Sequence, residues 1–283
     1  MDFHSIPSPS FVLDEKLLRG NLELIAEVQQ NAGVNIILAL KGFAMWRMFP
    51  MVYRYLQGAT ASSLHEARLI FEEMGVKAHT YAPAYLPSEM DEMLAYSSHL
   101  TFNSLSQYER FREQVHAYPE KVSCGLRVNP EYSPVEVALY NPGAPGSRLG
   151  IAPDHLKDGL PEGIEGLHFH VLCESSSFDL ERAIQAFEKH YGHFIPQLKW
   201  VNMGGGHLMT RKGYDTAHLI SILQDFRRRH DVEVILEPGS AIAWDTGVLT
   251  ATVLDIVENR GIRTAMLDVS FTCHMPDTLE MPY

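Results

Sequence analysis

The sequence has few cysteines and no long apolar run. Its three cysteines, Cys124, Cys173 and Cys273, form neither a close pair nor a metal-spaced cluster. This sparse, odd count argues against a disulfide framework and fits a reducing cytosol. No segment approaches the ~20 apolar residues of a membrane span, and the N-terminus lacks the basic and then apolar pattern of a signal peptide. We therefore expect a cytoplasmic protein with no membrane partner.

Basic residues are also scarce. The chain has 23 Lys and Arg against 35 Asp and Glu, for a formal charge of −12. This balance disfavours nucleic acid as a partner. The one basic cluster, Arg227-Arg228-Arg229, falls late in a predicted helix, where cations complement the helix dipole. The 14 histidines show no metal-ligand spacing, so we expect no metal site.

Strand-like and helix-like segments alternate along most of the chain, which favours a parallel sheet. An amphipathic helix is predicted over residues 15–30, and further helical patterns fill most gaps between the strands. Eight such units predict an α/β fold, a (β/α)8 TIM-like barrel of roughly the usual ~250 residues. The β-like runs are residues 35–40, 58–61, 78–82, 100–102, 122–128, 166–171, 198–203 and 232–236.

The pattern changes after Glu237. Residues 247–257 and 264–269 are β-rich with no helix between them, which indicates a second, antiparallel β domain. We expect a barrel over residues 10–240 and the start of the C-terminal domain over 241–283, with residues 1–9 as a candidate addition. No closing hairpins are visible, so we expect this domain to be incomplete in this sequence. Residues 129–165 should form an extended loop over the barrel mouth, with a short helix near 154–157.

Candidate site residues follow the predicted strands. Barrel enzymes carry their active-site residues at the carboxyl ends of the strands and often bind phosphate after strands seven and eight. One mouth of the barrel should therefore collect Lys41, Ser62, Arg127, His170, Gly204, Gly205, Gly206, Glu237 and Ser240.

Lys41 ends the apolar run at residues 35–40. Desolvation lowers the pKa of an amine, and a lysine without its extra proton can form a Schiff base. The alternative is a lysine that lays its stem along the strand end and keeps its charge in water.

The other candidates fit a pyridine cofactor with a phosphate group. The imidazole of His170 could stack on the ring or be a satisfied core histidine. Three successive glycines could cradle the phosphate with backbone N–H groups or form a flexible loop. A carboxylate at Glu237 would keep the ring nitrogen protonated, or would cap the turn that follows it. Arg127 could orient His170 or form a buried ion pair.

Two segments near the mouth remain open. Residues 173–177, Cys-Glu-Ser-Ser-Ser, could contact phosphate or substrate, or cap the helix that starts near Asp179. Arg148, in the long loop, could reach an anion or form a salt bridge.

Together these residues resemble the fold-type III pyridoxal-phosphate decarboxylases, which include the ornithine and diaminopimelate enzymes. They are most similar to the carboxynorspermidine (carboxyspermidine) decarboxylase family, and the resemblance covers residues 6–283. The motifs that carry it are Leu-Lys41-Gly-Phe-Ala, Leu-Cys173-Glu-Ser and Asp268-Val-Ser-Phe-Thr-Cys-His-Met-Pro-Asp277, beside the triple glycine and Glu237-Pro-Gly.

The resemblance implies a cofactor, a reaction and an assembly. Pyridoxal 5'-phosphate would be carried by Lys41, with His170 on the ring, the triple glycine on the phosphate and Glu237 at the ring nitrogen. The reaction would be α-decarboxylation of carboxynorspermidine or carboxyspermidine in norspermidine and spermidine biosynthesis. The assembly would be a homodimer with shared active sites.

The resemblance has two departures. Ornithine-type enzymes usually carry arginine after Glu-Pro-Gly, where this chain has Ser240. The family's catalytic cysteine, partner acidic residue and phosphate-binding tyrosine belong to a later segment that cannot be located here. Within the same fold, decarboxylation of diaminopimelate or another basic amino acid is an alternative function. A non-catalytic pyridoxal-phosphate-binding or regulatory protein is an alternative of another class.

The carboxylated polyamine substrate carries ammonium groups beyond the reacting amine. Carboxylates would pair with these groups, and the candidates are Glu174, Asp268 and Asp277. For Asp268 the alternative is an aspartate that bonds its own turn.

Overall fold

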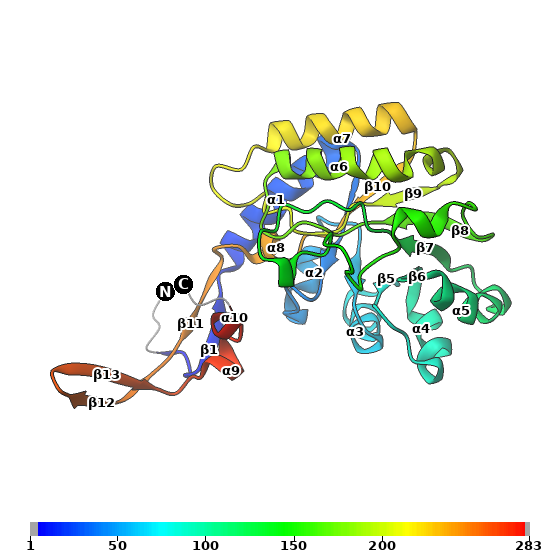
Figure 1. The fold of residues 1–283 in the computed structure, drawn as a ribbon. Coiled ribbons are helices and arrows are strands. Elements are labelled where there is room, and N and C mark those ends of the chain that lie inside the picture. The colour runs from blue at the N-terminus through cyan, green and yellow to red at the C-terminus, as the bar shows by residue number, and fades with distance from the viewer. Residues whose placement is uncertain (1–4, 281–283) are drawn as a thin grey trace. The chain divides into compact units, whose positions relative to one another are not determined.

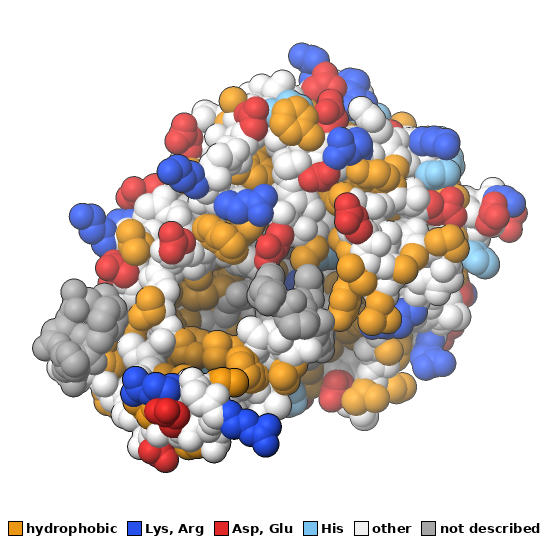
Figure 2. All heavy atoms as spheres, turned by 60° about the vertical axis from the view of Figure 1, so that its left-hand side comes forward, with side chains coloured by type: hydrophobic (Ala, Val, Ile, Leu, Met, Phe, Trp, Pro, Cys, Tyr) orange, Lys and Arg blue, Asp and Glu red, His pale blue; other side chains and the backbone are white. Residues whose placement is uncertain are grey.

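The computed structural model describes residues 5–280 and divides into two compact units (Figure 1). One unit comprises the chain up to Leu18 together with the residues from Asp245 onward, and the other is Arg19–Trp244. Within residues 5–280, none of the helices combines the length and the apolar character needed to cross a bilayer. Figure 2 shows Lys and Arg side chains interspersed with Asp and Glu over the visible face.

The larger unit is a nearly closed parallel barrel, so the predicted barrel is confirmed. Its strands pair in the order β2-β10-β9-β8-β7-β6-β5-β4-β3, each parallel to its neighbours. They are β2 (Asn35–Ile36), β3 (Leu38–Ala39), β4 (Ala59–Ala61), β5 (Ala78–Tyr81), β6 (Ser97–Phe102), β7 (Ser123–Arg127), β8 (Ile164–His168), β9 (Trp200–Asn202) and β10 (Glu233–Leu236).

The barrel closes through its first strand segment, which we predicted as one strand over residues 35–40. It is instead divided at Ile37, whose amide donates to the carbonyl of Leu236 at 3.0 Å, while the next amide, of Leu38, donates to Gly58 at 3.0 Å. β2 therefore pairs with the last strand and β3 with the next. An apolar run carries no sign of such a change of partner, because the residues on both sides of Ile37 are buried and apolar.

Helices line the outside of the strands (Figure 1). Their apolar stripes face the sheet, and α6, for example, buries Leu180, Ala183, Ile184 and Phe187. One of the helical patterns expected between the strands, over residues 46–56, forms only a 3-10 segment and one α-helical turn, since Pro50 lacks an amide donor. The α-helices are α1 (Glu15–Ala32), α2 (Phe49–Val52), α3 (Leu64–Met74), α4 (Met90–Tyr96), α5 (Leu105–Ala117), α6 (Ser177–Tyr191), α7 (Thr216–His230) and α8 (Ser240–Ala243), with 3-10 segments η2 (Trp46–Met48), η3 (Pro87–Glu89) and η6 (Gly192–Gln197).

Aromatic rings fill the barrel near the amino ends of its strands. Trp200 lies against Gly125 and Gly166, where a Cβ on either glycine would overlap the indole ring. The indole N–H donates to the hydroxyl of Ser123 at 2.9 Å. His99 meets the same ring edge-on at 5.5 Å between centroids. The two glycines thus make room for the largest side chain in this layer.

The long connection after β7 contains only the 3-10 segments η4 (Ala138–Tyr140) and η5 (Pro153–Leu156), the latter where a short helix was predicted. Asn103, just beyond the carboxyl end of β6, holds it. The Asn103 amide group donates to the carbonyl of Arg148 and accepts from the amide of Gly150, both at 2.9 Å. The loop is therefore tied to the carboxyl ends of the strands.

The smaller unit is antiparallel. β1 (Ser10–Leu13) pairs with β11 (Gly247–Thr250), and β12 (Val253–Asn259) forms a hairpin with β13 (Ile262–Leu267). The one-turn helices α9 (Phe271–His274) and α10 (Asp277–Glu280) follow. Residues 10–13, which we had placed in the barrel, thus pair with the C-terminal β segment. Of the segment 1–9, residues 1–4 lie outside the described residues.

Candidate active site

His170 links side chains and backbone from four strand ends. It lies two residues beyond β8, and its Nε2 is 3.4 Å from Nζ of Lys41, which follows β3. Its Nδ1 accepts from the amide of Gly205, after β9, at 2.9 Å. Its carbonyl oxygen accepts from Arg127, at the end of β7, at 2.9 Å. The structure therefore brings these four predicted site residues together.

The contact with Gly205 sets the tautomer of His170. Because Nδ1 accepts a hydrogen bond from a backbone amide, the ring proton of the neutral imidazole lies on Nε2. Burial and the nearby charges of Lys41 and Arg127 lower the pKa of His170 well below its usual value, so the ring is neutral. Nε2–H then points at Nζ of Lys41, which can accept only when the amine has lost its extra proton.

The surroundings of Lys41 favour the same state. Although the side chain reaches solvent, burial of the amine lowers its pKa, and this outweighs the carboxylate of Glu237, which raises it. The positive charge of Arg127 lowers the pKa further. An amine with a lowered pKa beside an N–H donor is the arrangement of a nucleophilic lysine.

Glu237, directly after β10, is 7% exposed. Burial raises the pKa of its carboxyl group, and hydrogen bonds from Asn202 and Thr60 act against that rise. The Asn202 side-chain amide donates to Oε1 at 2.7 Å. Glu237 is thus a buried carboxylate with fixed donors and not a turn cap exposed to water.

Asn202 was not predicted from the sequence. This last residue of β9 donates from Nδ2 to Glu237, and its Oδ1 accepts from the amide of Gly204 at 2.9 Å. It joins the carboxylate to the glycine loop. Its position directly before Met203 and the three glycines was the signal available.

The three glycines pack closely against neighbouring backbone, and their predicted role toward phosphate remains a prediction. A Cβ on Gly204 would lie 2.6 Å from the carbonyl oxygen of Phe169, and one on Gly206 would overlap the backbone of Leu172. Gly204 and Gly206 also have φ values of +68° and +89°. The amides of Gly204 and Gly205 donate to Asn202 and His170. Only Gly206 of the three remains a candidate amide donor to phosphate.

Arg127 is 5% exposed and acts on His170 through the backbone. Besides its bond to the His170 carbonyl, its guanidinium lies 4.7 Å from the centre of the Tyr81 ring. The interpretation of Arg127 as an orienting group is thus the one that its contacts support.

The remaining predicted cofactor residues are more peripheral. Ser62 is exposed after β4, and its amide donates to Oε2 of Glu66 at 2.6 Å. Ser240 is exposed at the first position of α8. The preceding Gly239 lies against Gly42, where a Cβ on Gly42 would meet Gly239 Cα at 2.7 Å. This close approach places the turn after Lys41 against the turn after Glu237.

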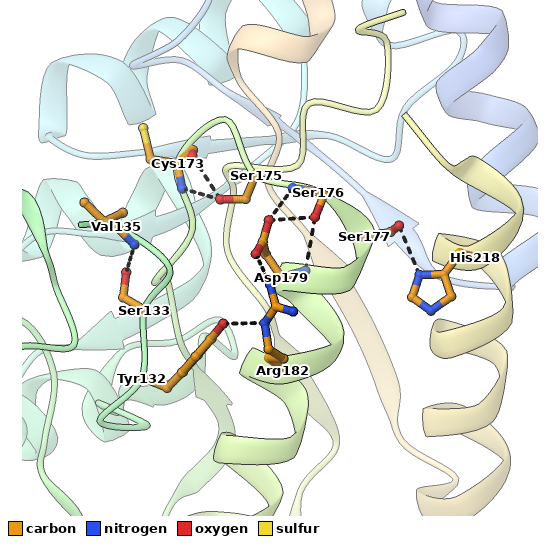
Figure 3. Close-up of polar contacts among 10 residues, drawn as sticks. All are labelled: Tyr132, Ser133, Val135, Cys173, Ser175, Ser176, Ser177, Asp179, Arg182 and His218. Carbon is orange, nitrogen blue, oxygen red and sulfur yellow. Dashed lines mark hydrogen bonds and ion pairs between the residues drawn. The ribbon is translucent and has the colours of Figure 1, made fainter. Parts of the chain in front are cut away.

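The segment 173–177 caps α6 (Figure 3). The Ser176 hydroxyl and amide form a capping box with Asp179, and the Ser175 hydroxyl donates to the carbonyl of Cys173 at 2.9 Å. Arg182 on the same helix donates to the Tyr132 hydroxyl at 2.9 Å. The capping interpretation therefore applies to Ser176, whereas Glu174 is exposed with φ of +46°.

Asp268 and Asp277 belong to the smaller unit. The carboxylate of Asp268 accepts from the hydroxyl of Ser8 at 2.7 Å and from the amide of Thr252 at 2.8 Å. These bonds lower the pKa of Asp268. Asp277 begins α10, and its side chain lies outside the described residues. Both assignments to substrate remain predictions.

His168, His170 and Glu237 place their ligand atoms within 4.8 Å of one another. A metal ion would need the lone pair of His170 Nε2, because Nδ1 accepts from Gly205. In the neutral ring that atom carries the proton. The tautomer therefore disfavours a metal at this cluster.

A cavity of about 730 Å³ lies beside the long loop, lined in part by Asn103, Asn129 and Arg148. With the residues that the structure describes, Arg148 forms no ion pair within 4.0 Å. The salt-bridge alternative for Arg148 is thus not the one observed, and its role toward an anion remains a prediction.

No model of a known protein family matches the chain. The chain is 51% identical over 280 residues to a carboxyaminopropylagmatine decarboxylase of Synechocystis, covering 99% of this chain and 72% of that one. It is 44% identical over 283 residues to a carboxynorspermidine/carboxyspermidine decarboxylase of Campylobacter jejuni, covering 100% and 73%. The crystal structure of carboxynorspermidine decarboxylase from Campylobacter jejuni, complexed with norspermidine, matches at a TM-score of 0.90 and 44% identity, over 98% and 72% of the chains.

Proposed function

Because the chain belongs to the family of carboxynorspermidine/carboxyspermidine decarboxylases, we propose that it removes the α-carboxylate of a carboxylated polyamine with pyridoxal 5'-phosphate as cofactor. Decarboxylases of this fold type generally use that cofactor. The observation that carries the proposal is the contact of Lys41 Nζ with His170 Nε2 at 3.4 Å, with the His170 tautomer set by Gly205 at 2.9 Å.

The residues at the mouth fit the cofactor. Lys41 offers an amine with a lowered pKa, and Glu237 offers a buried carboxylate whose Oε1 is held by Asn202. Lys41 would hold the cofactor covalently, His170 would lie on its ring and Glu237 would face its ring nitrogen. The phosphate would be held by the amide of Gly206, with Ser62, Arg127, Ser240, Gly204 and Gly205 shaping the site.

The cofactor, when bound, supplies an electron sink for the electron pair left at Cα when CO2 departs. The chain's own residues make that sink effective. Glu237, whose carboxyl group accepts hydrogen bonds from Asn202 and Thr60 against the effect of burial, would keep a proton at the ring nitrogen of the bound cofactor. Nζ of Lys41, beside Nε2–H of His170, can accept and return a proton near Cα. Arg127 fixes the His170 backbone and so the ring above the site.

A direct assay tests the proposal. Purified protein loaded with pyridoxal phosphate should release CO2 and norspermidine from carboxynorspermidine, and should show the absorbance of a cofactor bound to lysine. Bound cofactor without release of CO2 would favour the non-catalytic alternative. Failure to take up cofactor at all would overturn the proposal itself.

Carboxyaminopropylagmatine is a second candidate substrate, supported by the 51% identity to the Synechocystis enzyme. Its guanidinium end is planar, whereas the polyamines end in a compact ammonium. A competition between the two carboxylated amines, measured as the ratio of their kcat/KM values, decides between them. A clear preference for diaminopimelate over both would move the chain to the alternative family.

Acidic side chains would receive the distal ammonium groups. Glu174 is the candidate in the barrel unit, because it is exposed and follows His170 by four residues in the connection between β8 and α6. Glu174→Gln should raise KM for a polyamine substrate several-fold, as expected for one lost charge pair, while kcat changes little. Asp268→Asn should likewise raise KM for a polyamine substrate. An equal rise in KM for a short amino acid that lacks the distal amine would indicate a structural role for Asp268.

A homodimer with shared active sites and a cytoplasmic location belong to the same proposal. Sedimentation of the purified protein over a range of concentrations measures the first. Mixing Lys41→Ala protein with a variant altered elsewhere in the site tests sharing, because shared sites regain part of the activity in the mixed dimer.

A further inference from the structure

His168, the last residue of β8, is a buried histidine whose imidazole ring stands out within the site. It is 2% exposed, and within residues 5–280 neither of its ring nitrogens has a partner. Buried polar groups are normally bonded, so such a residue calls for an explanation. His207 differs, since its Nε2 lies 3.0 Å from the carbonyl oxygen of Gly204.

The carboxylate of Glu237 lies close to the His168 ring. Nε2 of His168 lies 3.7 Å from Oε2 of the carboxylate, whereas Oε1 is already held by Asn202 at 2.7 Å. The edge-on rings of Tyr81, at 5.3 Å, and His170, at 6.4 Å, fix the imidazole from two sides. The second carboxylate oxygen therefore faces the His168 ring, while Thr60 also bonds the Glu237 carboxyl group.

The imidazole of His168 is neutral. Burial lowers its pKa well below the usual value, and the positive charges of Arg127 and Lys41 add to the effect. A neutral imidazole has one N–H and one lone pair. With the proton on Nε2, it can donate to Glu237 without adding a charge to the site.

We propose that His168 is a positioning residue for Glu237, donating from Nε2 to Oε2 so that both carboxylate oxygens are held while the carboxylate faces the cofactor's ring nitrogen. This rests on the proposed role of Glu237. The present separation exceeds an ordinary hydrogen bond by roughly 0.5 Å. Hydrogen bonds of catalytic groups are often long in the free enzyme and tighten in the loaded one, and a small side-chain rotation closes this one.

A matched pair of variants separates donation from packing. His168→Gln keeps a donor near the Nε2 position, and His168→Leu keeps similar bulk without one. The dissociation constant of pyridoxal phosphate, from absorbance titration of the cofactor-free enzyme, should rise about 10-fold in His168→Leu and no more than about 3-fold in His168→Gln. Equal losses in the two variants would overturn the proposal.

The stability of His168→Leu separates a positioning role from a packing role, because the two roles predict opposite changes in the midpoint of urea unfolding. Since His168→Leu replaces a buried, unpaired imidazole with an apolar group, its midpoint of urea unfolding should stay or rise. A lower midpoint would identify a structural residue. In the cofactor-free and in the cofactor-loaded protein, 15N NMR of labelled histidine should find the His168 proton on Nε2, and a proton on Nδ1 would contradict donation to Glu237.

A double-mutant cycle tests whether His168 acts through the carboxylate. In a Glu237→Ala background, His168→Leu should change cofactor affinity by less than about 2-fold, because the acceptor is gone. A full 10-fold loss in that background would show an action that bypasses Glu237. If the unaltered enzyme binds no cofactor, the proposed function fails first, and the tautomer measurement still judges His168.

Discussion

The two ends of the barrel hold their polar groups in different ways. At the carboxyl ends of the strands, Lys41 and Glu237 are charged or chargeable groups whose pKa values are shifted toward neutrality by burial. At the amino ends, the carboxylate of Glu165 pairs with two lysines in the outer surface, and its pKa falls to about 2. The groups at the carboxyl ends are thus suited to exchange protons, whereas the ion pairs at the amino ends stabilise the fold.

The interior layers differ in the same sense. Near the amino ends, stacked His79 and His99 and the Trp200 ring fill space with few unsatisfied groups. Near the carboxyl ends, His168 is buried, and among the described residues neither of its ring nitrogens has a hydrogen-bond partner. In barrel enzymes catalysis resides at the carboxyl ends of the strands and stability is concentrated at the other end. The following variants break or sharpen that contrast, from the largest expected effect to the smallest.

Replacing Lys41 should have the largest effect. Lys41→Ala removes the amine that holds the cofactor, so we expect activity to fall by ~10³-fold or more and borohydride labelling of the protein to disappear. Lys199→Ala, at the other end of the barrel, is the matched control and should keep both. Label trapped on Lys77 or Lys199 in the Lys41→Ala protein would refute the assignment.

Glu237→Gln should come next. The amide keeps the shape of the carboxylate but not its charge, and a lost charged hydrogen bond of about 3 kcal/mol corresponds to ~10²-fold in kcat. Glu165→Gln, at the opposite end, should leave kcat unchanged and lower the free energy of unfolding by up to about 1 kcal/mol. Near-normal turnover of cofactor-loaded Glu237→Gln would contradict the electron-sink role.

Gly166→Ala should affect stability and not chemistry. The added methyl group would overlap the Trp200 ring, and overpacking of this kind costs ~1–3 kcal/mol. Urea unfolding measures the loss, while kcat of the folded fraction should hold. In the Trp200→Leu background the cost should shrink, because the smaller side chain leaves room. An unchanged urea midpoint in the Gly166→Ala single variant would show that the Trp200 ring moves aside at no cost in stability.

Acid should weaken the amino-end layer. The pKa of His99 lies at about 4, lowered chiefly by burial, against an unfolded value of 6.5. The unfolded chain therefore binds more protons between these values, and the stability present above pH 6.5 is lost as the pH falls toward 4. From pH 7 to pH 5 this one group accounts for about 2 kcal/mol. In His99→Gln, the free energy of unfolding, measured by urea titration at each pH, should fall by about 2 kcal/mol less between pH 7 and pH 5. An unchanged pH dependence of that free energy would exclude His99 as the cause.

Much of the site could be predicted because its residues lie at the carboxyl ends of successive strands. The alternation of strands and helices indicates the barrel, and parallel strands bring their carboxyl ends to one mouth. Lys41, Arg127, His170 and Glu237 therefore meet there, as expected. Contacts that depend on which strands become neighbours could not be read in this way. Asn202 reaches across to Glu237 only because β9 pairs with β10.

The sequence by itself determined the order of strands and helices, the residues at each strand end and the change to β structure after Glu237, since periodicity and chain order are local properties. Only the tertiary structure decided the division of the first strand at Ile37, the pairing of residues 10–13 with β11, and the use of the Gly204 and Gly205 amides inside the protein. It also decided that the His168 ring, which has no hydrogen bond within residues 5–280, lies beside Glu237. The physical reason is that hydrogen-bond partners and burial depend on distances between segments far apart in the chain, which no local pattern contains.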